Sequence, residues 1–596
     1  MNTSQLSLQF LRPYAFGSLP LRRPAYLAFY ELVSARGACR IGRQTRCLAT
    51  ARQQGADGGE YDPEKTSAFI AGRIRKLSEA HALSYPRLEH HGTAMTIPAF
   101  REKFKGQLAG SYTDQEVALH GRIRSIRRAS SKLLFIDLVE EFERVQGLCN
   151  YGKFDSNNVS LEQFKSIARL LQRGDHVAIT GRVTRTPTGE LTLEATELPR
   201  LLSPSLVPIP EKLQDEDQRI QNRHLDMLVN QETADVLRLR SYVIKYMRDF
   251  FHDRGFLEFQ TPILAGNASG ATARPFSTTA SEFPDKELAL RIAPELWLKR
   301  LVIGGVDKVF EIGPAFRNEG IDATHNPEFT TCEFYNAYAN LQDLISQTEQ
   351  LLTGLAEHSQ TQISEKLTSL EPINLSSYAR PYKQLEFIPS LEAALGFQFP
   401  DLNMDTAFAD LLSLLETHDL IGQLGSAPIP SLNKLLDRLA AVYLEPHSAT
   451  SPLFITHHPA CMAPLSKSFT CPKTGQVVSA RAELFMGGRE LANMYEEEND
   501  PFAQRRKLVE QARAKEQQQR TASSARSPEE DDEPAHVVDE SYISALEAGL
   551  PPTGGWGCGI ERLVMLFSGA RRISDCLSFG TLRNVVGLSS AGRKDV

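Results

Sequence analysis

Three short blocks of this sequence carry residues that could do chemistry, and the first joins an arginine to an aromatic ring. Arg317 and Glu319 precede a short loop, and Phe329 follows that loop. An arginine guanidinium presents a planar fork of donors that suits a phosphate, and an aromatic ring offers a stacking face to a base. The block favours a nucleotide site, although an ordinary hairpin with surface salt bridges would use the same residue types.

The second block places two carboxylates, Glu483 and Glu490, in an otherwise apolar, glycine-containing segment. Buried carboxylates are costly unless they are paired. An Mg²⁺ ion held through one or two carboxylates and substrate phosphates would pair them. A pair of salt-bridged acids is the alternative, and it would be favoured if this block stood alone.

The third block alternates glycines before an arginine. Gly555, Gly557 and Gly559 lie along an expected strand, and Arg562 follows where an apolar helix begins. Glycines at every second position strip one face of a strand of its side chains, so another group must approach that backbone closely. An arginine at such a strand-to-helix junction can reach a phosphate or lie on a base.

A helix and a set of short strands must position these blocks. Apolar residues from Val236 to Phe250 recur at steps of three and four, which predicts a helix over 233–252. About five short apolar runs within residues 115–200 predict a small β-barrel. A proline-rich stretch follows the barrel and is expected to form a stiff linker.

In order and spacing, the helix at 233–252 and the first and third blocks resemble the three motifs of the class II aminoacyl-tRNA synthetases. Within that class the sequence is most similar to the lysyl-tRNA synthetases. The stretches that decide this are 269–276, 291–296, 320–330 and 551–553. The resemblance extends over roughly residues 66–590.

The resemblance implies an α+β fold. An N-terminal OB-fold β-barrel would precede a class II catalytic domain built on a mixed, mainly antiparallel sheet flanked by helices. A segment rich in Gln, Ser and acidic residues cannot bury a core, which favours a disordered insertion within the catalytic domain. The expected organisation is a transit peptide over 1–55, a helical segment over 56–110, the OB-fold over 111–203, a linker over 204–228 and the catalytic domain over 229–596, with the insertion at 514–538.

The activity implied by the resemblance is the ATP-dependent ligation of L-lysine to tRNA(Lys) through lysyl-adenylate, with release of diphosphate and AMP. Arg317 would bridge the α-phosphate and the lysine carboxylate, and Arg562 would meet the γ-phosphate. Mg²⁺ would bind Glu483 and Glu490. The residues expected to hold ATP are Arg317, Glu319, His325, Asn326, Phe329 and Arg562.

The same resemblance assigns the lysine site. Gly270 and Glu295 would receive the α-amino group. A buried ammonium needs carboxylate partners, and a fully desolvated charge pair can dominate discrimination between substrates. The residues expected to receive lysine are Gly270, Glu295, Arg317, Glu333, Tyr335, Asn493, Tyr495 and Glu497, with Glu333 and Glu497 as partners of the ε-ammonium.

The barrel resembles the anticodon-binding domain of subclass IIb. Residues 101–135 hold eight basic and three acidic side chains, a local basic face that suits a nucleic acid. Phe135 would stack on an anticodon base and Gln146 would read a base edge. A place for Phe135 in the barrel core is the alternative.

The composition of the amino-terminal segment and the distribution of apolar residues along the chain bear on the location of the protein and on its partners. Residues 1–52 contain eight Arg, no Lys and a single acid, Glu31, which is typical of a mitochondrial transit peptide, while a basic tail is the alternative. No apolar run in the 596 residues reaches the ~18 that a membrane helix needs. We expect a protein of the mitochondrial matrix that forms homodimers through the first motif and binds tRNA(Lys), ATP and L-lysine but no membrane.

Three other functions were weighed against this hypothesis. An aspartyl- or asparaginyl-tRNA synthetase shares the architecture, but Glu333 and Glu497 would repel an acidic substrate. A ligase that attaches lysine to proteins would lack the barrel. A synthetase-like RNA-binding protein without catalysis would not need its catalytic residues intact, as they are here: Arg317, Glu483, Glu490 and Arg562.

Overall fold

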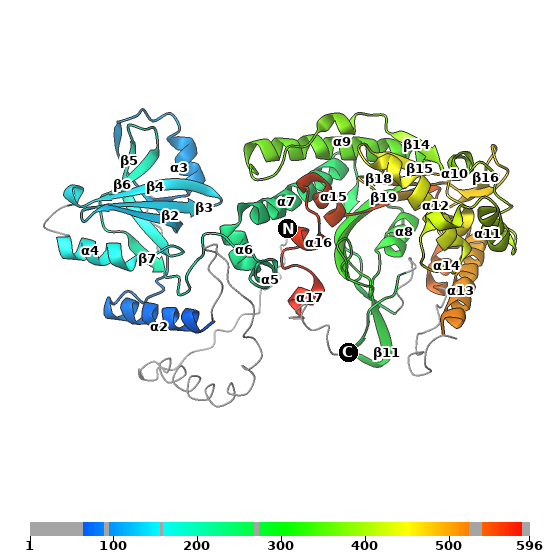
Figure 1. Ribbon diagram of the computed structural model, residues 1–596, viewed down its shortest axis with the longest axis horizontal. Coiled ribbons are helices and arrows are strands. Elements are labelled where there is room, and N and C mark those ends of the chain that lie inside the picture. Colours follow the sequence, from blue (N-terminus) through cyan, green and yellow to red (C-terminus); the bar gives the residue numbers. More distant parts are fainter. Residues whose placement is uncertain (1–62, 89–93, 155–158, 267–272, 524–538, 587–596) are drawn as a thin grey trace, which may run out of the picture. The chain divides into compact units, whose positions relative to one another are not determined.

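The computed structural model describes residues 63–88, 94–154, 159–266, 273–523 and 539–586 (Figure 1). The predicted transit peptide and Gly270 lie outside these residues. In the part of the chain that is described, no helix is long and apolar enough to cross a membrane.

The barrel predicted from the apolar runs is confirmed. Strands β2, β3, β4, β6 and β5 pair in that order, and β5 pairs back with β2, so the ring of strands closes. Along β3, Leu134, Ile136 and Leu138 are buried and alternate with more exposed residues, as a strand with one face on a core requires. The elements are α2 Pro63–Glu79, β1 Ala94–Met95, α3 Ile97–Lys103, β2 Tyr112–Ser130, β3 Leu133–Glu140, β4 Glu143–Asn150, α4 Leu161–Leu170, β5 His176–Arg185, β6 Leu191–Ala195 and β7 Arg200–Ser203.

An eight-stranded sheet carries the three sequence blocks. Its order is β14-β15-β18-β19-β20-β13-β12-β8, and only the outermost pairs, β14–β15 and β12–β8, are parallel. The sheet is therefore mixed and mainly antiparallel, as predicted. Its strands are β8 Leu257–Glu258, β12 Lys308–Phe316, β13 Glu328–Ala337, β14 Lys383–Glu386, β15 Leu453–Thr456, β18 Arg481–Met486, β19 Arg489–Glu496 and β20 Thr553–Gly559.

Helices cover both faces of this sheet. One face is covered by α7 Gln231–His252, which confirms the predicted helix. The side chains of Leu239, Val243 and Met247 on α7 are fully buried in a core shared with α9 Leu341–Glu365 and α15 Ile560–Ser568. On the other face, α8 Glu295–Ile303 and α14 Glu540–Leu546 share a smaller core with β12 and β13.

The remaining elements surround the sheet. A separate core joins three helices, α10 Phe387–Leu395, α11 Ala407–Thr417 and α12 Leu432–Tyr443, to the β14–β15 edge. The others are β9 Leu264–Ala265, β10 Ser277–Ala280, β11 Phe283–Leu290, β16 Ser468–Thr470, β17 Val477–Ser479, α13 Pro501–Ser523, α16 Ile573–Cys576 and α17 Leu582–Val585.

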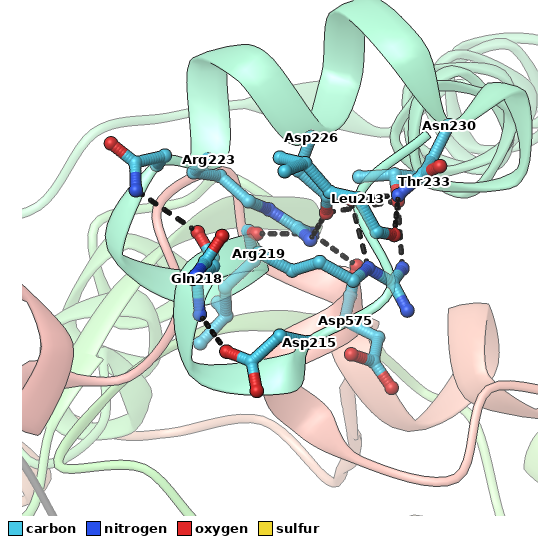
Figure 2. Close-up of polar contacts among 11 residues, drawn as sticks. Leu213, Asp215, Gln218, Arg219, Arg223, Asp226, Asn230, Thr233 and Asp575 are labelled. Carbon is cyan, nitrogen blue, oxygen red and sulfur yellow. Dashed lines mark hydrogen bonds and ion pairs between the residues drawn. The ribbon is translucent and has the colours of Figure 1, made fainter. Parts of the chain in front are cut away.

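The expected linker at 204–228 contains two short helices, α5 Glu216–Gln221 and α6 Arg223–Val229. The carboxylate of Asp226 explains them. It is fully buried and accepts hydrogen bonds from Arg219, Arg223, Asn230 and Thr233 at 2.6–3.0 Å (Figure 2). Arg223 also donates to the backbone oxygen of Asp575 in α16. Ion pairing thus anchors a segment that proline content alone marked as a spacer.

The helix α13 continues through Ser523 and so overlaps the first part of the segment, 514–538, that was expected to be disordered. Residues 514–523 are rich in Ala, Gln, Lys, Glu and Arg, which are good helix formers even without an apolar face. Residues 524–538 lie outside the described part of the chain.

Candidate active site

A cavity of about 530 Å³ opens on the eight-stranded sheet where the three sequence blocks converge. Its walls come from α8, from the β12–β13 hairpin, and from strands β18, β19 and β20. The predicted site residues that line it are Glu295, Arg317, Glu319, His325, Asn326, Phe329, Glu333, Tyr335, Glu483, Glu490, Asn493, Tyr495 and Arg562. Glu497 lies buried behind the wall, and Gly270 is not described.

Two arginines stand at one end of this cavity. The guanidinium of Arg317 lies over the ring of Phe329, 5.1 Å from its centroid, and its Nε has no hydrogen-bond partner among the described residues. Arg562 begins the helix after β20, donates to the backbone oxygen of Glu490 at 2.8 Å, and lies 3.4 Å from Nε2 of His325. This end holds guanidinium donors and an aromatic face, the groups that a nucleotide requires.

The remaining predicted nucleotide residues belong to the loop of the hairpin. Asn326 is bonded to backbone: its side chain donates to Glu328 O at 2.6 Å and accepts from Leu582 N at 3.0 Å. The ring of His325 is paired with Asp322 at 2.8 Å. Glu319 is exposed. Asn326 thereby fixes the loop, whereas Glu319 and His325 remain accessible from solvent.

Glu483 and Glu490 lie on neighbouring strands and face the same cavity. Burial alone would raise the pKa of Glu483, but the ion pair with Arg481 and the hydrogen-bonded contact with His458 lower that pKa to about 2. For Glu490, burial and the charge of Glu483 raise the pKa. Glu490 is paired with Arg562 at 3.2 Å. Among the described residues no group of three or more potential ligands stands ready for a metal.

Sequence reasoning missed Arg481. Its Nε donates to Asn493 Oδ1 at 2.9 Å, and its NH2 group is paired with Glu483. The signal was available, because residues two apart on a strand share a face and Arg481 precedes Glu483 by two positions.

A buried cluster of charges lies behind the other end of the cavity, where Glu295, Glu333 and Tyr495 line the wall. Lys299 in α8 is fully buried, lies 2.7 Å from Glu295 Oε1, and forms an ion pair with Glu497. The hydroxyl of Tyr495 donates to the same oxygen of Glu295 at 2.6 Å. Neither carboxylate oxygen of Glu497 makes a hydrogen bond of regular geometry within the described structure. The sequence analysis did not single out Lys299, although its spacing of four residues from Glu295 predicts contact on a helix.

Burial governs the ionisation of the acids at this end. Desolvation and the nearby charge of Glu295 raise the pKa of Glu333 to about 8, against the opposing effect of Arg317. Desolvation also raises the pKa of Glu497 well above its ordinary value, while Lys299 opposes that rise. Three carboxylates thus share a dry space that holds too few cations to satisfy them.

The alternating glycines of β20 explain how these carboxylates fit. In register, Gly555 lies between Tyr335 and Tyr495, and Gly557 lies between Glu333 and Asn493. A Cβ at Gly555 would collide with the Glu497 carboxylate and stand 2.7 Å from Tyr335 Cε1. At Gly557 it would stand 3.3 Å from Glu333 Cγ. The close approach predicted for this backbone is confirmed, and the approaching groups are the chain's own carboxylates.

The acids beside Glu497 face elsewhere. Glu496 accepts a hydrogen bond from the backbone of Leu341 at 3.0 Å, and Glu498 is paired with Lys507 at 2.7 Å. Glu497 is therefore the acid of this run that joins the buried cluster around Lys299.

On the barrel, Phe135 lies on the outer face of β3. It is half-buried between the core residues Leu134 and Ile136, and the guanidinium of Arg127 lies 4.2 Å from its ring centroid. Gln146, on the adjacent strand β4, is half-buried and lies 3.3 Å from Thr192 Oγ1. The alternative that placed Phe135 in the core is wrong, because the pleat directs its neighbours inward instead.

Comparison with known proteins agrees with this geometry. Residues 215–583 match the family of class II tRNA synthetases (D, K and N), and residues 117–201 match the OB-fold nucleic acid binding domain. The mitochondrial lysine–tRNA ligase of Schizosaccharomyces pombe is 40% identical over 87% of this chain and 94% of its own length. The mitochondrial lysine–tRNA ligase of Saccharomyces cerevisiae is 36% identical over 82% of this chain and 87% of its own length. A lysine–tRNA ligase of Thermoanaerobacter is 35% identical over 83% of this chain and 91% of its own length. The chain thus belongs to the class II tRNA synthetases and, within them, to the family of lysine–tRNA ligases.

Proposed function

We propose that this protein activates L-lysine with ATP and transfers the lysyl group to tRNA(Lys). The observation that carries the proposal is the division of one cavity into two ends. Arginines and an aromatic face occupy one end. The buried acids Glu295 and Glu333 line the other end, and Glu497 lies buried behind it. The first end suits a nucleotide. The second end suits lysine, because lysine is the one amino acid among the D, K and N substrates of this family whose side chain is a cation.

In the proposed lysine site, Glu333 and Glu497 receive the ε-ammonium, with Tyr335 and Asn493 beside them. Glu295 and Gly270 receive the α-amino group. The Oε1 atom of Glu497 supports this role, because it is buried and has no partner among the described residues, whereas Oε2 pairs with Lys299.

Activation is the attack of the lysine carboxylate on the α-phosphate of ATP, which forms lysyl-adenylate and releases diphosphate. Arg317 stands between the two ends, next to Phe329 on one side and close enough to Glu333 to lower its pKa on the other. It is proposed to hold the carboxylate and the α-phosphate together, and Arg562 to bind the γ-phosphate. The catalytic contribution of these residues is positioning and charge neutralisation.

Glu483 and Glu490 fit an Mg²⁺ ion that also binds substrate phosphates. They supply hard oxygen donors from adjacent strands, and two carboxylates suffice when phosphates complete the coordination. Arg481 and Arg562 neutralise the pair in this structure. When bound, the ion would neutralise charge on the departing diphosphate. If Arg562 binds a phosphate instead of Glu490, the Glu490 carboxylate becomes available to the ion.

The remaining parts of the proposal concern assembly and location. Leu257, Ile263 and Leu264 are exposed apolar residues on and beside the short strands β8 and β9, which supports a homodimer formed through this edge. Relatives named as mitochondrial and the arginine-rich composition of residues 1–52 support import into the matrix.

Amino-acid-dependent exchange of pyrophosphate into ATP, run with all twenty amino acids, tests the proposed activity. Exchange with lysine, followed by charging of tRNA(Lys), is expected. Exchange with aspartate or asparagine, or lysine exchange without tRNA charging, would contradict it.

The tRNA contact is tested by Phe135→Ala. Stacking on an aromatic side chain contributes about 1–3 kcal/mol per base, so kcat/KM for tRNA should fall by about fivefold to a hundredfold. Pyrophosphate exchange should not change. Tyr112→Ala removes an exposed aromatic side chain elsewhere on the barrel and is the control, with an expected change within about twofold.

A further inference from the structure

Lys299 is a fully buried cation that does not line the cavity, yet it touches two of the acids proposed to bind lysine. Its Nζ lies 2.7 Å from Glu295 Oε1 and pairs with Glu497. These acids come from different elements, since Glu295 begins α8 and Glu497 follows β19. One side chain therefore fixes the distance between the groups proposed for the α-amino and side-chain ends of the substrate.

The surroundings of Lys299 leave it few other roles. The rings of Tyr335, Tyr495 and Tyr542 surround its Nζ at 5.7–5.9 Å from their centroids. Tyr542 is itself fully buried and belongs to α14. The charged groups that face this space are Glu295, Glu333, Glu497, Lys299 and Arg317. Glu311 lies opposite Glu333 on β12, and its charge is matched by its own partner Arg291.

The charges of this set match the proposed substrate. With all five groups ionised, three carboxylates and two cations leave a formal charge of −1. Lysine at neutral pH carries a net charge of +1, so the loaded pocket would be neutral. Without Lys299 the loaded pocket would keep an uncompensated buried charge, which is costly in a dry site.

We propose that Lys299 is a positioning residue for lysine recognition, which pairs with Glu295 and Glu497 and keeps both carboxylates directed at the substrate. The inference rests on the proposed function and goes beyond it, because it assigns part of the selectivity to a side chain outside the cavity. Lys299 occupies one side of each carboxylate and leaves the other side to the two ammonium groups of the substrate.

The test compares Lys299→Met with Lys299→Arg, which keeps the charge, and with Leu298→Ala, which opens a buried site on the same helix. In pyrophosphate exchange, Lys299→Met should raise the KM for lysine at least about tenfold, which is the change that a shift of one unit in the pKa of Glu497 would cause. The KM for ATP should stay within about twofold. The pH at which lysine binding is half-maximal should move upward, because Glu497 loses the cation that opposes the rise in its pKa. Lys299→Arg should keep the wild-type pH midpoint, and Leu298→Ala should lower the melting temperature without separating the two KM values.

Calorimetry gives a second, independent measurement. Lysine binding at pH 7, followed in buffers of different ionisation enthalpy, should release fewer protons in the wild type than in Lys299→Met, because Lys299 opposes the rise in the pKa of Glu497. Equal proton release by the two proteins would overturn the proposal, as would equal changes in both KM values of Lys299→Met. A wild-type protein that exchanges pyrophosphate with another amino acid would refute the proposed function instead.

Discussion

The molecule contains two buried ion clusters with opposite charge balance. Around Asp226, one carboxylate receives two arginines, an amide and a hydroxyl, and each of its oxygens accepts two hydrogen bonds (Figure 2). Around Lys299, one ammonium serves Glu295 and Glu497, and Glu333 lies in the same dry space.

The difference separates a cluster that serves folding from one that awaits a ligand. The closed cluster has nothing left to bind, so its removal should cost stability and leave recognition intact. The open cluster keeps carboxylates with raised pKa values and unsatisfied oxygens, so its removal should cost recognition and leave stability intact.

The largest effect is expected for Asp226→Ala. This change leaves the cations of Arg219 and Arg223 without their shared carboxylate, and breaking a buried ion pair from one side costs about 3–5 kcal/mol. Denaturant unfolding should show this loss in the free energy of unfolding, while the KM for lysine of the folded protein stays the same.

A matched control is Asp215→Ala, which removes the exposed N-cap of α5 and should cost only about 1 kcal/mol. If Asp226→Ala melts like the wild type, the cluster does not hold the segment in place.

Glu497→Gln should have the next largest effect, on binding. The change removes the charge that faces the proposed ε-ammonium, and the loss of one partner from a buried pair corresponds to at least about a hundredfold in KM for lysine. Steady-state exchange should show this rise with the KM for ATP unchanged and no loss of melting temperature. Glu498→Gln, whose acid pairs with Lys507 outside the pocket, is the control; equal effects of the two variants would contradict the assignment.

Gly555→Ala and Gly557→Ala sharpen the comparison from the backbone side. The first adds a methyl group where the Glu497 carboxylate and Tyr335 leave no room, and the second adds one 3.3 Å from Glu333 Cγ. Overpacking costs about 1–3 kcal/mol, so Gly555→Ala should weaken lysine binding by about fivefold to a hundredfold and Gly557→Ala by less. Direct binding of lysine by calorimetry measures both, and the reverse order would show that Glu333 is the less movable acid.

The smallest predicted effect is the pH dependence of lysine binding. The pKa of Glu333 is raised to about 8, so this acid is protonated and neutral in the empty pocket below that pH. A bound cation requires it ionised, and the Kd for lysine should therefore fall about tenfold from pH 6 to pH 7 and level off above pH 8. Glu333→Gln should bind lysine more weakly and lose this dependence, and an unchanged slope in that variant would assign the titration to another group.

The residue pattern by itself determined most of the fold and most of the site. Apolar residues at steps of three and four predicted the helix of the first motif, because the face of α7 that is buried must be apolar. Alternate glycines at 555, 557 and 559 predicted a close approach to β20 because a missing Cβ is visible in the sequence. Residue type marked the acids and arginines as expensive to bury, and therefore as candidates for chemistry.

The tertiary structure alone decided how those charges are shared. Lys299, Arg481 and Asp226 are ordinary charged residues in the sequence, and each acquires its role from partners that other segments bring within hydrogen-bond distance. The outward direction of Phe135 likewise follows from the register of β3 in the closed ring. Burial and pairing are properties of the folded chain, because desolvation depends on every element that covers a group, whereas periodicity and residue type are properties of short stretches that the sequence displays directly.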